Sequence, residues 1–216
     1  MPSATRESRW AGSAWLFARQ GRRASLVPGG TLGGSQVGAR ITYRLNGRPG
    51  RALALSGRVY AALDDLDSGE AAVGVEWQPL ARLPVRLLAE RRQALGNSGR
   101  SAFSLLAHGG VSDRRLAGPL LVDAYAQAGV VGLHSRDLFA DGSLRAGIAA
   151  GDGLKIGVGA WGAAQPEVAR LDIGPQVSWR LPAQRTGIVL ALDWRFRVAG
   201  NARPASGPAL TLATDF

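Results

Sequence analysis

Two histidines stand near residues that could support hydrolytic chemistry. His108 follows Ser104 on the same face of an extended segment, and His134 adjoins Ser135 and Asp137. A serine hydrolase needs its nucleophile, base and acid in a defined spatial arrangement, which adjacency in the sequence does not supply. Neither histidine stands in a nucleophile signature of defined spacing. We therefore predict no catalytic residues.

The sequence also offers no ligand set for a metal ion or a cofactor. It contains no cysteine and two histidines, so a cysteine-based metal site is excluded. The Gly151-Asp152-Gly153 segment and the other glycine pairs lack the spacing of a phosphate-binding loop and are typical of turns. We predict neither a metal site nor a cofactor.

Charged side chains recur at alternate positions of extended segments, opposite an apolar face. Between residues 187 and 198, for example, Asp193, Arg195 and Arg197 alternate with large apolar residues. Such charges could line a lumen and set its selectivity toward anions or acidic saccharides; alternatively they could form a packed interior of mutually satisfied ion pairs. The candidate lumen residues are Arg40, Arg44, Arg58, Glu76, Arg86, Glu90, Asp123, Arg145, Lys155, Arg170, Asp172, Arg180, Asp193, Arg195 and Arg197.

The formal charge of +10 makes nucleic acid the first partner to consider. The arginines, however, are scattered singly over the extended segments, and the sequence shows no recognition helix. Arginine in a polar lumen, or arginine facing anionic lipopolysaccharide, fits this scatter better than a nucleic-acid patch. We predict no nucleic-acid partner.

The elements that carry these charges alternate with period two, as strands with one apolar and one polar face do. Counting them gives twelve, and an even number is the rule for bacterial single-chain membrane barrels. Thirty glycines and only five phenylalanines argue against an ordinary soluble core. No stretch approaches the ~20 apolar residues of a membrane-spanning helix. The sequence predicts an all-β, transmembrane, antiparallel up-and-down β-barrel over residues 10–216, after a disordered segment at 1–9.

The connections sort into two classes. If Phe216 lies at the periplasmic end, the longer connections fall outside the cell and the shorter ones fall in the periplasm, the asymmetry of outer-membrane barrels. The turn predicted at 111–119 is long for its side. The predicted outer loops are 21–34, 64–69, 93–100, 134–142, 165–168 and 199–209, and the short inner turns include 46–50, 151–153 and 182–185.

The last strand ends on an aromatic residue. Leu210, Leu212 and Phe216 share one face, and this pattern resembles the C-terminal signal of barrels assembled into the outer membrane. We expect this strand to pair with the first, near residues 10–20, and to be recognised by the barrel-assembly machinery. Outer-membrane lipid and lipopolysaccharide are the expected surroundings. The N-terminus lacks the apolar core of a signal peptide, so we expect the chain to be part of a longer exported protein or its start to lie upstream.

Residues 77–92 (WQPLARLPVRLLAERR) resemble part of the C-terminal barrel of the bacteriophage adsorption protein A family, with a proline-containing turn followed by an Ala-Glu-Arg strand. The segment at 123–129 (DAYAQAG) and the terminal Phe216 also fit. In that family, and in the similar outer-membrane barrel component of bacterial cellulose synthase, the barrel follows a periplasmic helical-repeat region. The resemblance implies a role in exopolysaccharide export or as a phage receptor.

From the sequence we predict a non-enzymatic, porin-like or anchoring barrel of the bacterial outer membrane, linked to exopolysaccharide export or phage adsorption. Polysaccharide or phage would be its partner. One alternative is an outer-membrane barrel enzyme acting on lipid or lipopolysaccharide. A second is a soluble β-barrel or sandwich that acts as a binding module, with large apolar residues inside and a mostly polar outer surface.

Overall fold

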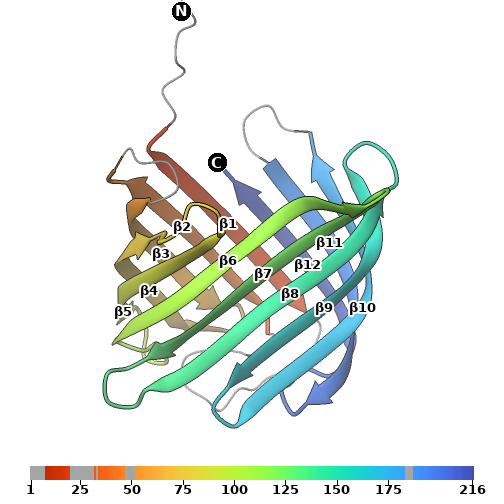
Figure 1. The fold of residues 1–216 in the computed structure, drawn as a ribbon. Helices are drawn as coiled ribbons and strands as arrows, with labels where there is room; N and C mark the ends of the chain where they lie inside the picture. Colours follow the sequence, from red (N-terminus) through yellow and green to blue (C-terminus); the bar gives the residue numbers. More distant parts are fainter. Residues whose placement is uncertain (1–7, 20–31, 33, 47–51, 183–186) are drawn as a thin grey trace, which may run out of the picture.

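The computed structural model describes residues 8–19, 32, 34–46, 52–182 and 187–216. Within these ranges the chain forms twelve strands and no helix (Figure 1). No helix in the described ranges is long and apolar enough to span a membrane. The strands are β1 (Trp10–Arg19), β2 (Gln36–Arg44), β3 (Leu53–Ala62), β4 (Asp65–Trp77), β5 (Val85–Ala94), β6 (Ala102–Ala117), β7 (Leu120–Val131), β8 (Asp137–Ala149), β9 (Leu154–Gln165), β10 (Val168–Leu181), β11 (Gly187–Gly200) and β12 (Gly207–Asp215).

Every strand pairs antiparallel with its neighbour in the sequence, and β12 returns to β1 to close the barrel. At this seam the paired residues run from Ser13 opposite Asp215 to Arg19 opposite Ala209. Phe216 extends the pairing, because its N–H donates to Gly12 O (2.9 Å) and its carbonyl accepts from Gly12 N (2.7 Å). The predicted twelve-stranded up-and-down barrel, closed between its first and last strands, is confirmed.

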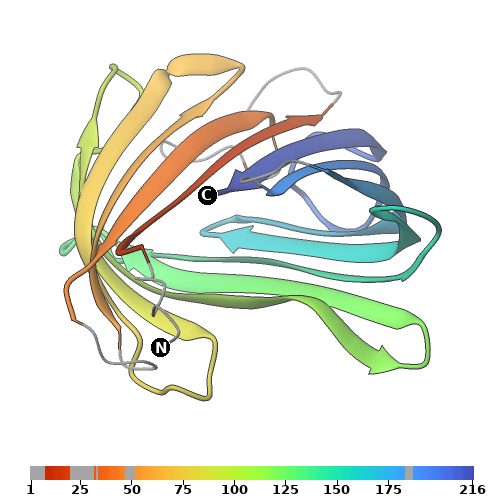
Figure 2. The ribbon, with the colours of Figure 1, turned by 90° about the horizontal axis from the view of Figure 1, so that it is seen from above.

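The start of β1 and the C-terminal end of the chain lie at the same end of the barrel (Figure 1). We call this the terminal end; it carries Trp10 and Phe216. The opposite end, which carries Arg19 and Gly200, is called the loop end. Viewed along the axis, the strands form a closed and flattened ring (Figure 2).

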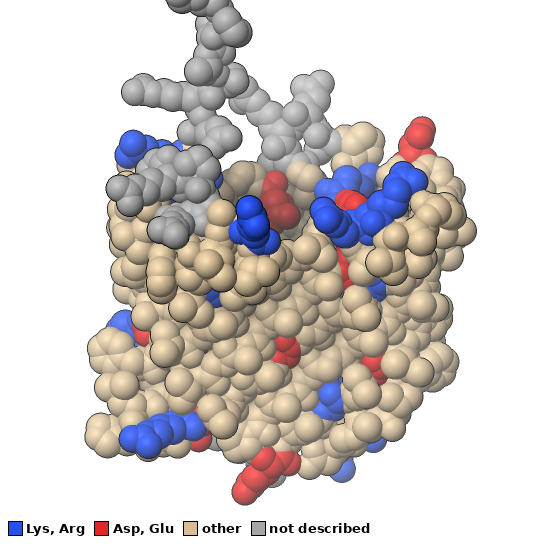
Figure 3. Space-filling view, in the orientation of Figure 1, with Lys and Arg blue, Asp and Glu red and all other residues tan. Residues whose placement is uncertain are grey.

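The two faces of the wall have opposite chemistry. Large apolar side chains point outward and are exposed, for example Val73 (68%) and Leu105 (56%), whereas Asp172 (0%) and Asp193 (2%) point inward and are buried. The face formed by β6–β10 is largely uncharged between its two ends, where most visible charged atoms gather (Figure 3). This arrangement is the inverse of a soluble barrel and is that of a transmembrane barrel.

Aromatic side chains mark the terminal end of the outer surface. Trp10, Trp77, Trp179 and Phe216 are exposed there at strand ends. The Trp10 ring also packs against Tyr43, with ring centroids 4.7 Å apart. Aromatic rings of this kind gather where a barrel passes from hydrocarbon to headgroups. The outward surface therefore carries one boundary of an apolar belt.

Three strands are longer than the sequence predicts. The segment at 64–69 is mostly strand, because β4 begins at Asp65 and only Leu63 and Asp64 separate it from β3. Likewise β6 runs to Ala117, so the predicted turn at 111–119 shrinks to Gly118 and Pro119, and β8 begins at Asp137 within the predicted loop 134–142. The pairing of β6 with β7 is irregular in this added part, with register shifts after Val111 and after Arg115.

These differences weaken the predicted asymmetry of the connections. Two connections at the loop end, between β3 and β4 and between β9 and β10, contain only two residues each. Most of the predicted loop 21–34, parts of the predicted turns 46–50 and 182–185, and residues 1–7 of the segment predicted to be disordered lie outside the described residues. Arg9 is described, and its carbonyl accepts a hydrogen bond from Arg44 N (2.9 Å).

Candidate functional site in the barrel interior

Most of the inward charges form four clusters rather than an even lining. Several ion pairs join strands that are not neighbours, such as Arg19 on β1 with Asp172 on β10. In a closed barrel such partners can meet only inside. The candidate site is therefore the interior itself, and its chemistry depends on how completely these charges satisfy one another.

The first cluster, called the mouth cluster, lies toward the loop end of β1, β10 and β11. It consists of Arg19, Arg170, Asp172, Asp193, Arg195 and Arg197. Arg19 Nη1 donates to Asp172 Oδ2 (2.8 Å). Arg170 contacts the same carboxylate through Nε to Oδ2 (3.0 Å) and Nη2 to Oδ1 (3.0 Å). Asp172 is therefore held between two guanidinium groups, the geometry of strong charge-assisted pairing.

Arg195 is held by both charge and stacking. Its Nη2 donates to Asp193 Oδ2 (2.8 Å), and Gln176 Nε2 donates to the other oxygen of that carboxylate (2.7 Å). The guanidinium carbon lies 4.2 Å from the Trp161 ring centroid and 4.7 Å from that of Phe17. Two aromatic faces against one guanidinium fix its plane through cation–π attraction. This side of the interior is consequently packed.

The second cluster, called the wall cluster, joins β3 to β6 and consists of Arg58, Glu70, Glu90, Arg92 and Ser104. Arg58 grips Glu90 with two donors, Nε to Oε2 (3.0 Å) and Nη2 to Oε1 (2.6 Å). Ser104 Oγ donates to the same carboxylate (2.9 Å), and Arg92 Nη2 lies 2.7 Å from Glu70 Oε2.

Arg58 reaches Glu90 across an intervening strand. It starts on β3, and Glu90 lies on β5, opposite Gly74 of β4. A Cβ atom at Gly74 would lie 2.7 Å from the Glu90 Cβ and 2.4 Å from Ala89 O. Glycine at this position therefore leaves the close approach of β5 and its carboxylate unobstructed, which explains why an inward glycine stands among charged residues.

The third cluster, called the histidine cluster, consists of Arg40, Glu76, Arg86 and His108. Glu76 accepts from Arg40 Nη2 and from Arg86 Nη1 (3.0 Å), and His108 Nε2 lies 3.2 Å from Glu76 Oε2. Ser104 instead donates to Glu90. His108 and Ser104 therefore have separate partners, and their arrangement is not that of a nucleophile with its base. His134 lies exposed in the connection between β7 and β8.

The fourth cluster, called the terminal cluster, consists of Asp113, Asp123, Lys155 and Arg180 at the terminal end of β6–β10. Lys155 Nζ donates to Asp123 Oδ2 (2.9 Å) and also to Asp113. Arg180 Nη2 donates to Asp113 Oδ2 (2.9 Å). Among the described residues, no group of three or more histidines and carboxylates is placed to hold a metal ion.

Of the charged residues singled out from the sequence, Arg44 and Arg145 lie outside these clusters. Arg44 is at the terminal end of β2. Arg145 stands opposite Asp123 in the register of β7 and β8, yet Asp123 pairs with Lys155 instead. Its Nε is buried, without a hydrogen-bond partner in the described part of the chain. Arg145 thus adds positive charge beside Asp123 and Lys155, on the same part of the wall.

Sequence reasoning did not find Arg19, the arginine of β1 that pairs with Asp172 of β10 in the mouth cluster. The cause is the composition of β1, in which Trp15 and Phe17 point inward together with Arg19. Apolar residues then occupy both faces of β1, so the alternation does not show which face points inward. The inward position of Trp161 was missed for the same reason, because an aromatic residue fits either face.

Inward side chains in the middle of the barrel are accessible to solvent along β7 and β8. Tyr125 lies on the inward face, two positions from Asp123, and is 40% exposed. Gln127, Asp141 and Arg145 on the same strip are only partly buried. The buried mouth cluster and wall cluster lie on other parts of the wall. The interior is consequently packed on two sides and less densely filled between them.

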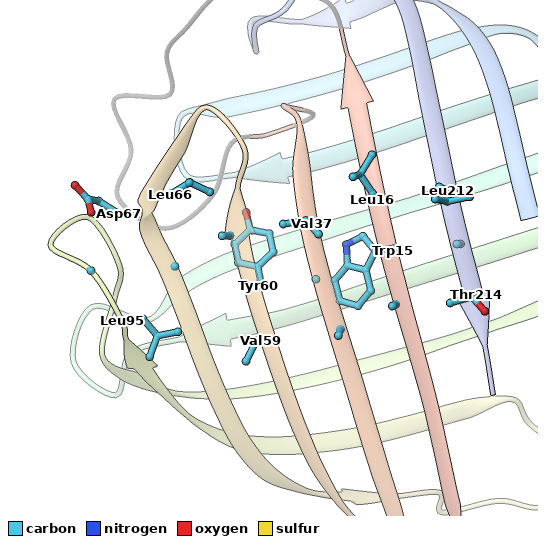
Figure 4. Close-up of a pocket in the computed structure, with 17 residues that line it drawn as sticks. Trp15, Leu16, Val37, Val59, Tyr60, Leu66, Asp67, Leu95, Leu212 and Thr214 are labelled. Carbon is cyan, nitrogen blue, oxygen red and sulfur yellow. The ribbon is translucent and has the colours of Figure 1, made fainter. Parts of the chain in front are cut away.

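The outer surface carries an apolar groove of about 570 Å³. It crosses β12, β1, β2 and β3 and extends to the first part of β4 and the connection after β5 (Figure 4). Because most of its large side chains belong to the outward face, the groove belongs to the outer surface and not to the interior. Its apolar lining includes Leu16, Val37, Val59, Leu66, Leu95 and Leu212.

No family model matches the chain, and no curated protein matches it. Among solved structures, the COG4313 outer membrane channel from Pseudomonas putida F1 aligns at a TM-score of 0.49 and 12% identity, covering 100% of this chain and 98% of that one. The transport unit of the autotransporter AIDA-I from Escherichia coli aligns at a TM-score of 0.42 and 10% identity, covering 100% of this chain and 91% of that one. Wzi from Escherichia coli, described as a carbohydrate-binding β-barrel involved in capsule assembly, aligns at a TM-score of 0.34 and 13% identity. The alignment covers 94% of this chain and 56% of Wzi. The architecture of this chain is defined by its own strand pairing.

Proposed function

We propose that this chain is a non-enzymatic, porin-like barrel of the bacterial outer membrane, with a narrow water-filled path that favours anions. We orient the barrel with its terminal end toward the periplasm and its loop end toward the outside of the cell, as for a barrel whose C-terminal strand ends on an aromatic residue. The apolar outer belt and the charged interior support insertion in a membrane.

The exposure of Tyr125 carries the proposal. A mid-strand, inward residue that is 40% exposed cannot belong to a packed interior. Around it, ion pairs occupy the wall cluster and the histidine cluster, which narrows the path. A barrel of this size holds either a packed interior or a small lumen, depending on how its side chains fill it. The water-accessible strip on β7 and β8 favours a small lumen.

Anion preference follows from incomplete neutralisation. In the mouth cluster, four arginines face two aspartates, a formal excess of two positive charges. Arg145 adds a cation beside the strip. A field of one sign in a narrow, low-dielectric passage concentrates counter-ions and repels co-ions.

Conductance in planar bilayers tests this function. The full chain, refolded from detergent into a bilayer, should give small conductance steps and a reversal potential in a salt gradient that indicates anion preference. Arg145→Gln should reduce the preference, whereas Arg91→Gln should not, because Arg91 stacks on Phe103 on the outer surface. A silent bilayer with folded protein would refute the channel and favour an anchor.

The biological context is a finer proposal. The resemblance of residues 77–92 to the adsorption protein A family supports a link to exopolysaccharide export or phage adsorption. Neighbouring genes for polysaccharide synthesis, or an upstream reading frame with a signal peptide and helical repeats, would support this link. Loss of the gene without any change in surface polysaccharide or phage sensitivity would contradict it.

A further inference from the structure

The connection between β11 and β12 is folded against the mouth cluster. Ala202 is 3% exposed, and its carbonyl accepts from Arg197 Nη1. The carbonyl of Pro204 accepts from Arg170 Nη2 (3.3 Å), and that of Ala205 accepts from Arg19 Nη2 (2.9 Å). Three arginines of the barrel wall thus hold three successive parts of one connection. This connection, residues 201–206, is called the mouth loop.

The groups that complete the bonding of these arginines are neutral. The carboxylates of Asp172 and Asp193 account for part of the donors, and backbone carbonyls take others, including Leu32 O, which accepts from Arg170 Nη1 (3.1 Å). A carbonyl oxygen is a neutral acceptor, and a guanidinium forms a stronger hydrogen bond with an anionic acceptor. The excess positive charge is therefore hydrogen-bonded but not neutralised.

One donor of the cluster has no partner at all among the described residues. Arg19 Nε is buried, and the Arg19 side chain has no exposed surface. A buried donor without an acceptor is uncommon and costs free energy. Together with the excess positive charge, this donor marks a place where an oxyanion would bind more strongly than the carbonyls of the mouth loop do.

We propose that the mouth cluster is a binding site for an oxyanion, a carboxylate or a phosphate, which displaces the carbonyls of the mouth loop and opens the barrel mouth. This proposal rests on the proposed function, because the site lies in the path of a solute only if the barrel is a channel. An anionic group would take the donors that now serve Ala202, Pro204 and Ala205. The solute would thereby release the mouth loop from the three arginines that now hold it.

The chain contains no cysteine, so a single introduced thiol reports on the mouth loop. In the full chain folded in detergent, the A202C thiol should react slowly with N-ethylmaleimide, a neutral reagent, because Ala202 is buried. Trigalacturonate or inorganic phosphate should accelerate the reaction by about tenfold, the scale of one charge-assisted hydrogen bond. Maltotriose, and chloride at matched ionic strength, should not. The two anions separate a carboxylate ligand from a phosphate ligand, and acceleration by either one supports the site.

Arg197→Gln is the variant of choice because the Arg197 side chain bonds to a backbone carbonyl, so its loss strands no buried carboxylate in the described part of the chain. In the A202C background it should raise the unliganded rate and reduce the response to anion. Arg180→Gln in the terminal cluster is the matched control and should leave both unchanged. If R197Q does not fold, as judged by heat-modifiable gel mobility, the comparison of the two anions with maltotriose decides.

The proposal is overturned if neither anion acts more strongly than maltotriose, or if R180Q abolishes the response as fully as R197Q. The outcome is separable from that of the channel. A silent bilayer together with anion-dependent A202C reactivity would refute conduction and leave the binding site. A conducting barrel whose A202C thiol ignores both anions would do the reverse.

Discussion

Removing Glu90 alone should destabilise the barrel much more than removing its whole ion pair. The Glu90 side chain is 2% exposed and accepts from both Arg58 and Ser104, while the Arg58 side chain is 20% exposed. Glu90→Leu would leave that guanidinium without its carboxylate inside the barrel. Breaking a buried pair from one side costs about 3–5 kcal/mol, because the remaining charge stays desolvated.

Replacing both partners should cost far less. In the double variant Arg58→Met/Glu90→Leu, no charge of the pair is left, and replacing such a pair with apolar residues is often neutral within about 1 kcal/mol. The Ser104 hydroxyl loses its acceptor, which adds about 1 kcal/mol. We therefore expect the double variant to be more stable than Glu90→Leu by at least about 2 kcal/mol.

The measurement is urea unfolding of the barrel refolded in lipid vesicles, followed by tryptophan fluorescence and extrapolated linearly to water. Asp137→Asn is the control, since the Asp137 pair with Arg100 lies at the rim with 38% of its side chain exposed, and it should change stability little. A double variant as unstable as the single one, or a Glu90→Leu change below about 1 kcal/mol, would refute the reasoning that Glu90 neutralises a desolvated charge.

Two further predictions concern the seam. Deleting Phe216 should reduce the fraction of chain that reaches the outer membrane in heat-modifiable form, because both of its backbone hydrogen bonds close the barrel onto Gly12; normal assembly without Phe216 would count against a role as assembly signal. Gly12→Val should lower the urea midpoint, since a Cβ there would lie 2.3 Å from the Phe216 ring, whereas Gly57→Val should not, since its Cβ would meet only an Ile41 methyl group, at 3.6 Å. Equal effects at the two glycines would show that the ring contact is unimportant.

The alternation of side chains predicted the barrel well where the wall crosses the apolar belt. It failed where strands continue past the belt, as in β4 from Asp65 and in β6 beyond Val111. Outside the belt both faces of a strand can be polar, so the contrast on which period two depends disappears. Backbone pairing persists there for its own hydrogen bonds, which the sequence pattern does not reveal.

Period two also assigns a charged residue to a face but not to a partner. Arg145 and Lys155 illustrate the difference: Arg145 stands opposite Asp123 in the register, yet Lys155, one strand further away, forms the ion pair. Partners across the interior depend on the stagger of the closed barrel, which is fixed only when β12 meets β1. The link between Arg19 and Asp172 therefore could not be predicted from either strand.

The bonds of the interior differ in how readily they can be exchanged. Arg58 with Glu90, and Arg19 with Asp172, join strands through charged partners, and breaking either would strand a buried charge. These pairs therefore fix the cross-section of the barrel. The bonds from Arg170 and Arg197 to the mouth loop have neutral acceptors, which a solvent molecule or an anion can replace at lower cost. The proposed opening of the barrel is therefore expected at the mouth loop, whose bonds to the wall arginines have neutral acceptors.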